Sequence, residues 1–227
     1  MSLSTGRGPL SGRPAGRFTA PVPEGVAYIE PFRRRVRGVK GGRTVIDSER
    51  VLLVHRAGRP PAYSFPEGDV IGVPAEADRD TPGYVVVPWD AADAWFEEDE
   101  QVLGHAKNPY HRVDCLRSGR RLRVEASGLT LVDTTETLAV YETALEPRLY
   151  VDPRLVRTDV LALGATHTYC PYKGTASYWT ARIGDVVLED VAWSYEDPLP
   201  ESTQLAHFLS FDETRVDVQH DLPAAAT

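Results

Sequence analysis

A stretch of sequence that recurs within the chain constrains the fold more than any other feature. Residues 36–70 align without a gap on residues 122–156, at an offset of 86 residues. The identical pairs include Gly42 with Gly128, Thr44 with Thr130, Asp47 with Asp133, Leu52 with Leu138, Val54 with Val140 and Pro61 with Pro147. A long gapless repeat of this kind predicts that one supersecondary unit occurs twice.

Two shorter matches follow in the same order. The segment AWFEED at 94–99 pairs with AWSYED at 192–197, and RVD at 112–114 pairs with RVD at 215–217. Three blocks in one order indicate a tandem duplication. The predicted parts are a flexible leader at 1–31, a divergent repeat A at 32–117, a repeat B at 120–219 and a tail at 220–227.

Each repeat has the pattern of an antiparallel sheet. The segments 129–133 (LTLVD) and 137–143 (TLAVYET) alternate large apolar with polar residues, which is typical of half-buried strands. Asp47 and Asp133 open short polar segments that we interpret as hairpin turns, and Gly184-Asp185 predicts another turn. Only 153–156 and 200–209 look helical. The chain is therefore predicted to be all-β, with few short helices.

Charge and cysteine content exclude several classes of protein. Residues 41–227 hold 31 acidic and 17 basic residues, and this net charge of −14 disfavours nucleic-acid binding. The basic run at 33–37 has the charge to contact phosphate, but we favour its interpretation as a solubilising arm or a clamp on the protein's own acidic surface. No apolar run approaches the roughly 18–20 residues of a membrane helix, and no secretory signal is recognisable. Two distant cysteines fit a reducing cytoplasm, and 22 arginines against three lysines suggest a bacterial source.

The residues that carry chemistry are densest at 167–179 in repeat B. This segment of 13 residues holds His167, Cys170, Lys173, Ser177 and four aromatic residues. Pro171 favours extended backbone at the residue before it. Gly174 permits a tight bend or the close approach of a ligand.

Repeat B resembles a known family. The motifs CPYKG and SYW, followed by AWSYEDPLP and preceded by YET…PRLYVDP, look like the bacterial domain-of-unknown-function family 427. The resemblance implies a fold of the β-tent group, in which small antiparallel sheets meet at an angle. Other β-tent proteins hold zinc with two CxxC pairs, which this chain lacks, so we expect no metal site. The family has no agreed activity.

The resemblance also implies candidate site residues. Matching the motifs selects Glu142, His167, Cys170 and Lys173 as possible catalytic groups. It selects as ligand-binding residues Arg148, Tyr150, Tyr172, Ser177, Tyr178, Trp193 and Tyr195. Repeat A departs from the motifs, because Glu142 corresponds to Arg56, Arg148 corresponds to Ala62, and CPYKG has no counterpart. The site is therefore expected to be degenerate in repeat A.

Each pairing in this segment has a functional and a structural interpretation. Cys170 with His167 forms either a thiolate–imidazole pair activated near Lys173 or a packed free thiol beside an unrelated histidine. Lys173 with Glu142 forms either an acid–base pair or anion clamp, walled by aromatic rings, or a structural ion pair. Trp95 and Trp193, which align with each other in the AWFEED and AWSYED segments, are interpreted mainly as core anchors.

Two functions of different classes remain open from sequence. In one, repeat B is a cofactor-independent enzyme acting on a small molecule with Glu142, His167, Cys170 and Lys173. In the other, the same pocket only binds a small metabolite, or the motif is structural. No cofactor, nucleic acid or membrane partner is expected, and a monomer and a homodimer are both compatible with the sequence.

Overall fold

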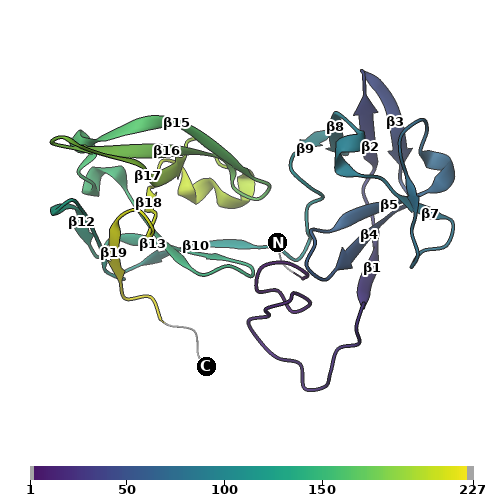
Figure 1. The fold of residues 1–227 in the computed structure, drawn as a ribbon, viewed down its shortest axis with the longest axis horizontal. Coiled ribbons are helices and arrows are strands. Elements are labelled where there is room, and N and C mark those ends of the chain that lie inside the picture. The colour runs from purple at the N-terminus through teal and green to yellow at the C-terminus, as the bar shows by residue number, and fades with distance from the viewer. Residues whose placement is uncertain (1–2, 224–227) are drawn as a thin grey trace. The chain divides into compact units, whose positions relative to one another are not determined.

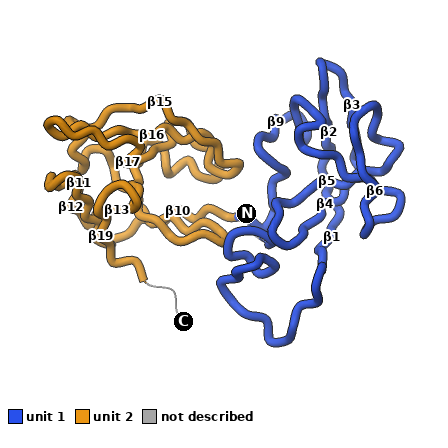
Figure 2. The backbone as a smooth tube through the Cα atoms, in the orientation of Figure 1, with its two compact units in different colours: residues 1–111 blue, residues 112–227 orange. Residues whose placement is uncertain are grey.

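The computed structural model describes residues 3–223, so residues 1–2 of the predicted leader and 224–227 of the predicted tail lie outside it. The chain is mostly β, as predicted, and divides into two compact units, residues 1–111 and 112–227 (Figure 2). Residues 113–117, which we placed in repeat A from sequence, lie in the second unit. None of the helices described here is long and apolar enough to span a membrane.

Unit 1 consists of two antiparallel sheets (Figure 1). The first runs in the order β1 (Ala27–Phe32), β4 (Val51–Arg56), β5 (Ala62–Pro66), β7 (Tyr84–Val86) and β6 (Glu76–Ala77). The second runs in the order β3 (Arg43–Ser48), β2 (Val36–Lys40), β8 (Ala94–Glu97) and β9 (Glu100–Val102). Two single turns of 3₁₀ helix, η1 (Glu67–Asp69) and η2 (Trp89–Ala91), lie in the connections. The core between the strands is rich in aromatic residues, with Phe65 fully buried and Trp95 nearly so.

Unit 2 has three antiparallel sheets. The first two have the orders β10 (Val113–Ser118), β13 (Thr137–Glu142), β14 (Arg148–Val151) and β12 (Leu129–Thr134), β11 (Leu122–Ala126), β19 (Asp217–His220). The third has the order β15 (Leu161–Cys170), β16 (Gly174–Ile183), β17 (Val186–Tyr195) and β18 (Ser210–Phe211). Short 3₁₀ helices are η3 (Pro153–Leu155), η4 (Thr158–Val160) and η5 (Pro200–Leu205).

The first four strands of the two units match at the sequence offset of 86. Strands β1, β2, β3 and β4 have the same bounds as β10, β11, β12 and β13 when 86 is added. The pairing registers also match, since β1–β4 begins at Ala27↔Arg56 and β10–β13 at Val113↔Glu142. Even the register shift at Gly38/Val39 recurs at Val124/Glu125. The alignment therefore corresponds to equivalent backbone, strand by strand.

The two aspartates at equivalent positions are not turn-formers. Asp47 and Asp133 lie within β3 and β12, and each accepts two hydrogen bonds from an arginine, Arg35 in unit 1 and Arg121 in unit 2. These arginines hold the pKa of both carboxyl groups below its usual range. The strands that follow, β4 and β13, enter a different sheet, so the connection is a corner between sheets rather than a hairpin. The prediction of a hairpin was wrong because a two-residue polar connection is compatible with a hairpin and also with a corner between two sheets.

The two later sequence matches do not join equivalent positions. Trp95 lies in β8, which pairs with β2, whereas Trp193 lies in β17 of the third sheet. The strand that pairs with β11 in the way β8 pairs with β2 is β19. RVD at 112–114 leads into β10, the counterpart of β1, and RVD at 215–217 leads into β19. The short matches arose because aromatic and acidic residues suit many strand ends.

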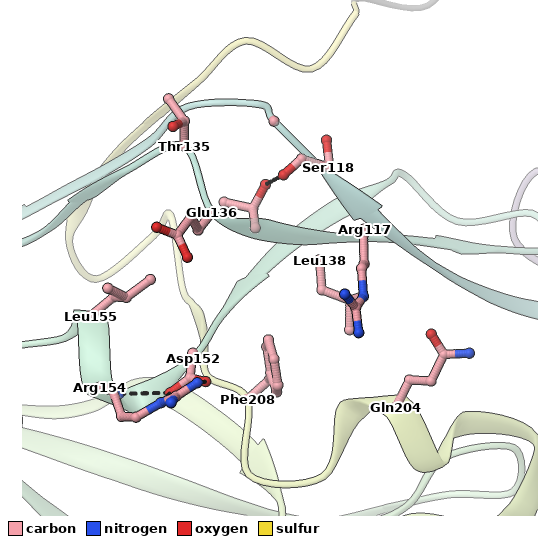
Figure 3. A pocket seen from close by; sticks show the side chains of 12 residues that line it. Arg117, Ser118, Thr135, Glu136, Leu138, Asp152, Arg154, Leu155, Gln204 and Phe208 are labelled. Carbon is pink, nitrogen blue, oxygen red and sulfur yellow. Dashed lines mark hydrogen bonds and ion pairs between the residues drawn. The ribbon is translucent and has the colours of Figure 1, made fainter.

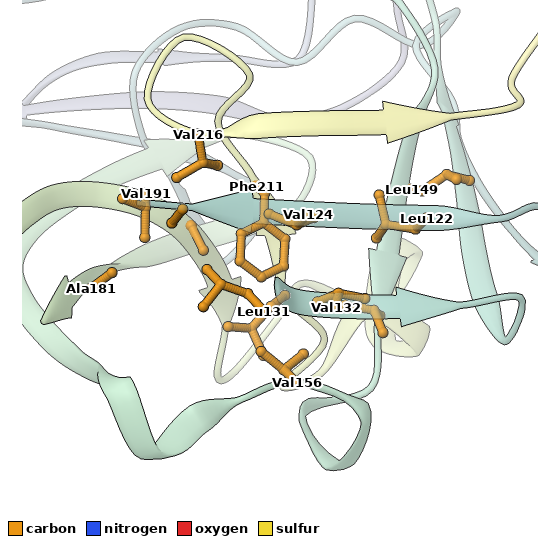
Figure 4. Packing of buried hydrophobic residues seen from close by; sticks show 14 of the residues in the cluster. Leu122, Val124, Leu131, Val132, Leu149, Val156, Ala181, Val191, Phe211 and Val216 are labelled. Carbon is orange, nitrogen blue, oxygen red and sulfur yellow. The ribbon is translucent and has the colours of Figure 1, made fainter. Parts of the chain in front are cut away.

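The ribbon of β15, β16 and β17 is the main addition in unit 2. Its register shifts between Leu163 and His167 in β15, and again opposite Trp179–Ala181 of β16. Bulges of this kind bend a strand and increase its twist. One end of the ribbon contributes Ala181 and Val191 to the first of two hydrophobic cores in unit 2. Phe211 lies at the centre of this first core (Figure 4). The other end packs in a second core.

That second core contains fewer side chains and adjoins the motif residues. Its buried members are Cys115, Leu138, Val140, Tyr150, Ala176, Tyr195 and Leu205. They come from β10, β13 and β14 on one side and from the ribbon and η5 on the other. The bend in the ribbon thus brings the motif residues of β16 and β17 over the β13–β14 pair.

The basic run near the start of unit 1 pairs with acids of the same unit. Arg34 pairs with Glu97, Arg35 with Asp47 and Arg37 with Asp99. This agrees with the interpretation of the run as a clamp on the protein's own surface. Within the leader, Ser4 is buried, and its hydroxyl donates to the Arg59 carbonyl at 2.6 Å.

Unit 1 is predicted to lose stability in mild acid through His55. The side chain is fully buried, with its Nε2 3.0 Å from Glu30 Oε1. Burial lowers the pKa of His55 below its usual 6.5, although Glu30 acts in the opposite direction. Below about pH 6.5 the unfolded chain binds a proton that the folded chain does not, so the free energy of unfolding falls as the pH falls. Equilibrium denaturation from pH 7.5 to pH 5 measures this. In His55→Gln the decline should be shallower, and equal slopes in the two proteins would contradict the prediction.

Candidate functional site

A cavity of about 490 Å³ in unit 2 gathers most of the motif residues. Its charged lining is Glu142, Glu146, Arg148, Lys173 and Asp212, and its aromatic lining is Tyr150, Tyr178, Trp193 and Tyr195. Val140 and Leu145 complete it. Seven of the eleven candidate residues from sequence are in this lining. The other four are His167, Cys170, Tyr172 and Ser177.

Strand periodicity explains why these residues converge. Val140 and Glu142 are two apart in β13, and Arg148 and Tyr150 are two apart in β14, so each pair shares a face. Val140 is directly opposite Arg148 in the β13–β14 register. On the facing ribbon, Tyr178 of β16 is directly opposite Trp193 of β17. The cavity therefore lies between the β13–β14 pair on one side and the β16–β17 pair on the other.

Lys173 and Glu142 form a buried ion pair at one side of the cavity. Lys173 Nζ donates a short hydrogen bond to Glu142 Oε2, and only 13% and 7% of the two side chains is exposed. The ammonium also lies 5.7 Å from the centre of the Tyr195 ring. Burial lowers the pKa of Lys173, but Tyr150, Glu142 and Tyr195 together outweigh it and raise the pKa well above its usual value. Lys173 therefore stays protonated and is not suited to act as a general base.

The equivalent position in unit 1 also carries an ion pair, with the charges reversed. Arg56 in β4 corresponds to Glu142 and pairs with Asp78 and Asp80, the latter at 2.8 Å. In unit 1 the pair joins β4 to the segment that follows β6, and in unit 2 it joins β13 to the turn that follows β15. This equivalence indicates that the Lys173–Glu142 pair is at least partly structural, because it anchors the CPYKG turn on β13.

Arg148 and three rings form the other side of the cavity. The Arg148 guanidinium lies 5.2 Å from the centre of the Trp193 ring. Trp193 Nε1 donates to the Tyr150 hydroxyl at 2.9 Å, and the Tyr178 ring centre lies 6.3 Å from that of Trp193. Burial raises the pKa of Tyr150, so its hydroxyl stays neutral. These contacts fix the rings in place and leave π-surfaces lining a preformed cavity.

His167 and Cys170 are not brought together. They are three residues apart in β15, and such residues point to opposite faces of a strand. His167 is exposed, with its Nδ1 3.4 Å from the Ser177 hydroxyl, and Cys170 is half-buried. Tyr172 is buried outside the cavity lining, and its carbonyl accepts from the Ser202 hydroxyl at 3.3 Å. The sequence suggested a pair because it could not show which face each side chain takes.

Replacing His167 by alanine is predicted to change little. The side chain is exposed and makes one long hydrogen bond, so the free energy of unfolding should change by less than about 0.5 kcal/mol. Chemical denaturation of the full chain measures this change. Ligand binding in the cavity should also be unaffected. A loss of binding without a loss of stability would instead restore His167 to the site.

Several residues of the site carry no signal in the sequence. Leu145, Glu146 and Asp212 line the cavity, but they lie in connections with no distinguishing pattern. Cys115 lies in the core beneath it, and burial raises the pKa of its thiol, which disfavours a reactive thiolate. Within residues 3–223, no three His, Cys, Asp or Glu side chains are grouped in a way that could hold a metal ion.

A larger groove of about 880 Å³ lies elsewhere in unit 2. Arg117 and Gln204 stand on one side of it, and Glu136 and Leu155 on the other (Figure 3). Arg154 forms two hydrogen bonds with Asp152, at 2.9 and 2.6 Å. The groove contains none of the eleven candidate residues. We therefore regard the smaller cavity as the candidate functional site.

Comparison with known proteins identifies a family for unit 2. Residues 114–222 match the family described as "Domain of unknown function (DUF427)", which is the family that the motifs predicted. Every residue that lines the cavity falls within this range. No curated protein matches the chain.

Proposed function

Residues 114–222 belong to the DUF427 family, and from this premise we propose that unit 2 binds a small planar molecule in the cavity between β13–β14 and β16–β17. The observation that carries the proposal is the convergence of four aromatic side chains and a buried ion pair on one cavity. A volume of about 490 Å³ lies within the range of small-molecule sites.

Binding is favoured over catalysis by the state of the candidate groups. Lys173 keeps its proton, and Glu142 is occupied by the ion pair. His167 and Cys170, the proposed base and nucleophile, are absent from the cavity lining. Nucleophilic catalysis needs a nucleophile and a base within hydrogen-bonding reach, and the lining provides no such pair. The rings and charges of the lining are instead suited to holding and orienting a ligand.

The test is a metabolite screen of the full chain by thermal unfolding, followed by tryptophan fluorescence for each compound that stabilises it. A ligand at 100 times its dissociation constant stabilises the folded state by about 2.7 kcal/mol. A planar ligand stacked in the cavity should change the emission of Trp193. Mass spectrometry of the ligand after incubation should find it unchanged.

Two variants show which tryptophan is responsible for the change in emission. Trp193→Phe should lose the change in emission, and Trp179→Phe should keep it, because Trp179 packs against the first core on the same ribbon. If both variants keep the change, the ligand binds elsewhere and the proposal fails. Conversion of the ligand by the wild-type chain would favour the enzyme hypothesis.

We also propose that the two units arose by duplication of one ancestral unit. The shared strand bounds, registers and bulge of β1–β4 and β10–β13 support this, as do the equivalent Arg35–Asp47 and Arg121–Asp133 pairs. An experimental structure of a single-unit relative should superimpose its first four strands on both units. A relative whose strands fit only unit 2 would count against duplication.

A further inference from the structure

The charges of the cavity distinguish between classes of ligand. Three acidic residues and two basic residues line it, which leaves a net charge of −1. Just outside the lining, Glu213 lies 3.5 Å from Arg148 Nη1, and the charge of Arg215 lowers the pKa of Asp212, so these two neighbours leave the balance unchanged. Both cations are thus already engaged with carboxylates. An anionic ligand would meet Glu146 and Asp212 in the lining, while both lining cations already interact with carboxylates.

The aromatic rings in the cavity already accept cations. The Arg148 guanidinium lies over Trp193 at 5.2 Å, and the Lys173 ammonium lies over Tyr195 at 5.7 Å. The face of an aromatic ring carries negative charge and attracts cations, most strongly where water is excluded. The Tyr178 ring, tilted 40° from Trp193, contributes a further aromatic surface to the same lining.

The charge of the whole unit acts in the same direction. Residues 112–227 contain 18 acidic and 11 basic residues, a net charge of −7. A field of this sign raises the local concentration of cations and lowers that of anions, most strongly at low ionic strength.

We infer that the ligand of this cavity is a small organic cation of the amidinium, guanidinium or quaternary ammonium class. The inference rests on the proposed function and adds the ligand's charge to it. The cation would contact the aromatic rings, with Glu146 and Asp212 supplying the counter-charge at the cavity wall.

Three probes of nearly the same shape test the charge. Benzamidine is a cation, benzamide is neutral and benzoate is an anion at pH 7. Calorimetric titration of the full chain at low salt should give the tightest binding for benzamidine and the weakest for benzoate. Raising the salt to about 0.5 M should weaken benzamidine binding and leave benzamide nearly unchanged.

A charge-neutral variant at the cavity provides the residue-level test. Glu146→Gln should weaken benzamidine binding about fivefold and leave benzamide binding nearly unchanged. Glu189→Gln is the matched control, because it removes the same charge from an exposed position on β17, and it should change neither. Tighter binding of benzoate than of benzamidine would overturn the inference and leave the proposed function standing. Binding of no probe, with no hit of any charge in the metabolite screen, would overturn both.

Discussion

Replacing Glu142 by leucine is expected to lower the free energy of unfolding of unit 2 by about 3–5 kcal/mol. The substitution leaves the Lys173 ammonium, whose side chain is 13% exposed in the intact protein, without its carboxylate beside the second core. The loss of an ion partner costs more than the pair contributes, because a buried charge without compensation is strongly disfavoured. Chemical denaturation of the full chain, followed by the fluorescence of the unit 2 tryptophans, measures the change.

The double variant Glu142→Leu/Lys173→Met separates the ion pair from simple packing. Removing both charges should recover most of the stability, since apolar residues of similar size often replace a buried pair at no cost. The exposed pair Arg121–Asp133 is the control, and Asp133→Asn should cost less than about 1 kcal/mol. A cost below about 1 kcal/mol for Glu142→Leu would mean that Lys173 reaches water and that the pair does not anchor the CPYKG turn.

Replacing Gly174 by valine should destabilise unit 2 by about 2–5 kcal/mol. Gly174 has φ +97°, a conformation that side-chain-bearing residues rarely adopt. A Cβ atom there would lie 3.2 Å from the Asp197 carbonyl oxygen, which is backbone and cannot move aside easily. The turn is also held by a hydrogen bond from Leu199 N to the Lys173 carbonyl at 3.1 Å.

Gly184 offers a matched control on the same ribbon. It has φ +58°, but a Cβ atom there would meet nothing within 4 Å. Gly184→Val should therefore show the cost of a positive φ without a close contact, and the extra loss in Gly174→Val in thermal or chemical unfolding measures the close approach together with the larger φ. Equal losses of unfolding free energy in the two variants would show that the contact with Asp197 does not contribute to the destabilisation.

The fold was largely predictable because strand signals are local. Alternation in LTLVD and TLAVYET placed β12 and β13, and the turn Gly184-Asp185 placed the β16–β17 hairpin. The offset of 86 held from β1 and β10 to η1 and η3. The later matches failed because only a few residues carried them, and the β15–β17 ribbon has no counterpart in unit 1.

The site was predictable only in part. The motifs selected Glu142, Lys173 and Trp193, which do line one cavity. They also selected His167 and Ser177, which contact each other away from the cavity lining. The motifs show that residues occur together but not which face of a strand each side chain takes, and the bulges in β15 and β17 bend the ribbon in a way that the motifs do not reveal.

Sequence by itself determined the all-β class, the family of unit 2 and the correspondence of the first four strands in the two units. The class follows from side-chain periodicity and turn chemistry, which act over a few residues, and the family follows from the resemblance of its motifs. The tertiary structure decided that Asp47 and Asp133 form ion pairs, that Lys173 is a buried cation, and that His167 and Cys170 point apart. Those features depend on contacts between residues distant in the chain, where burial and neighbouring charges determine pKa values and side-chain partners.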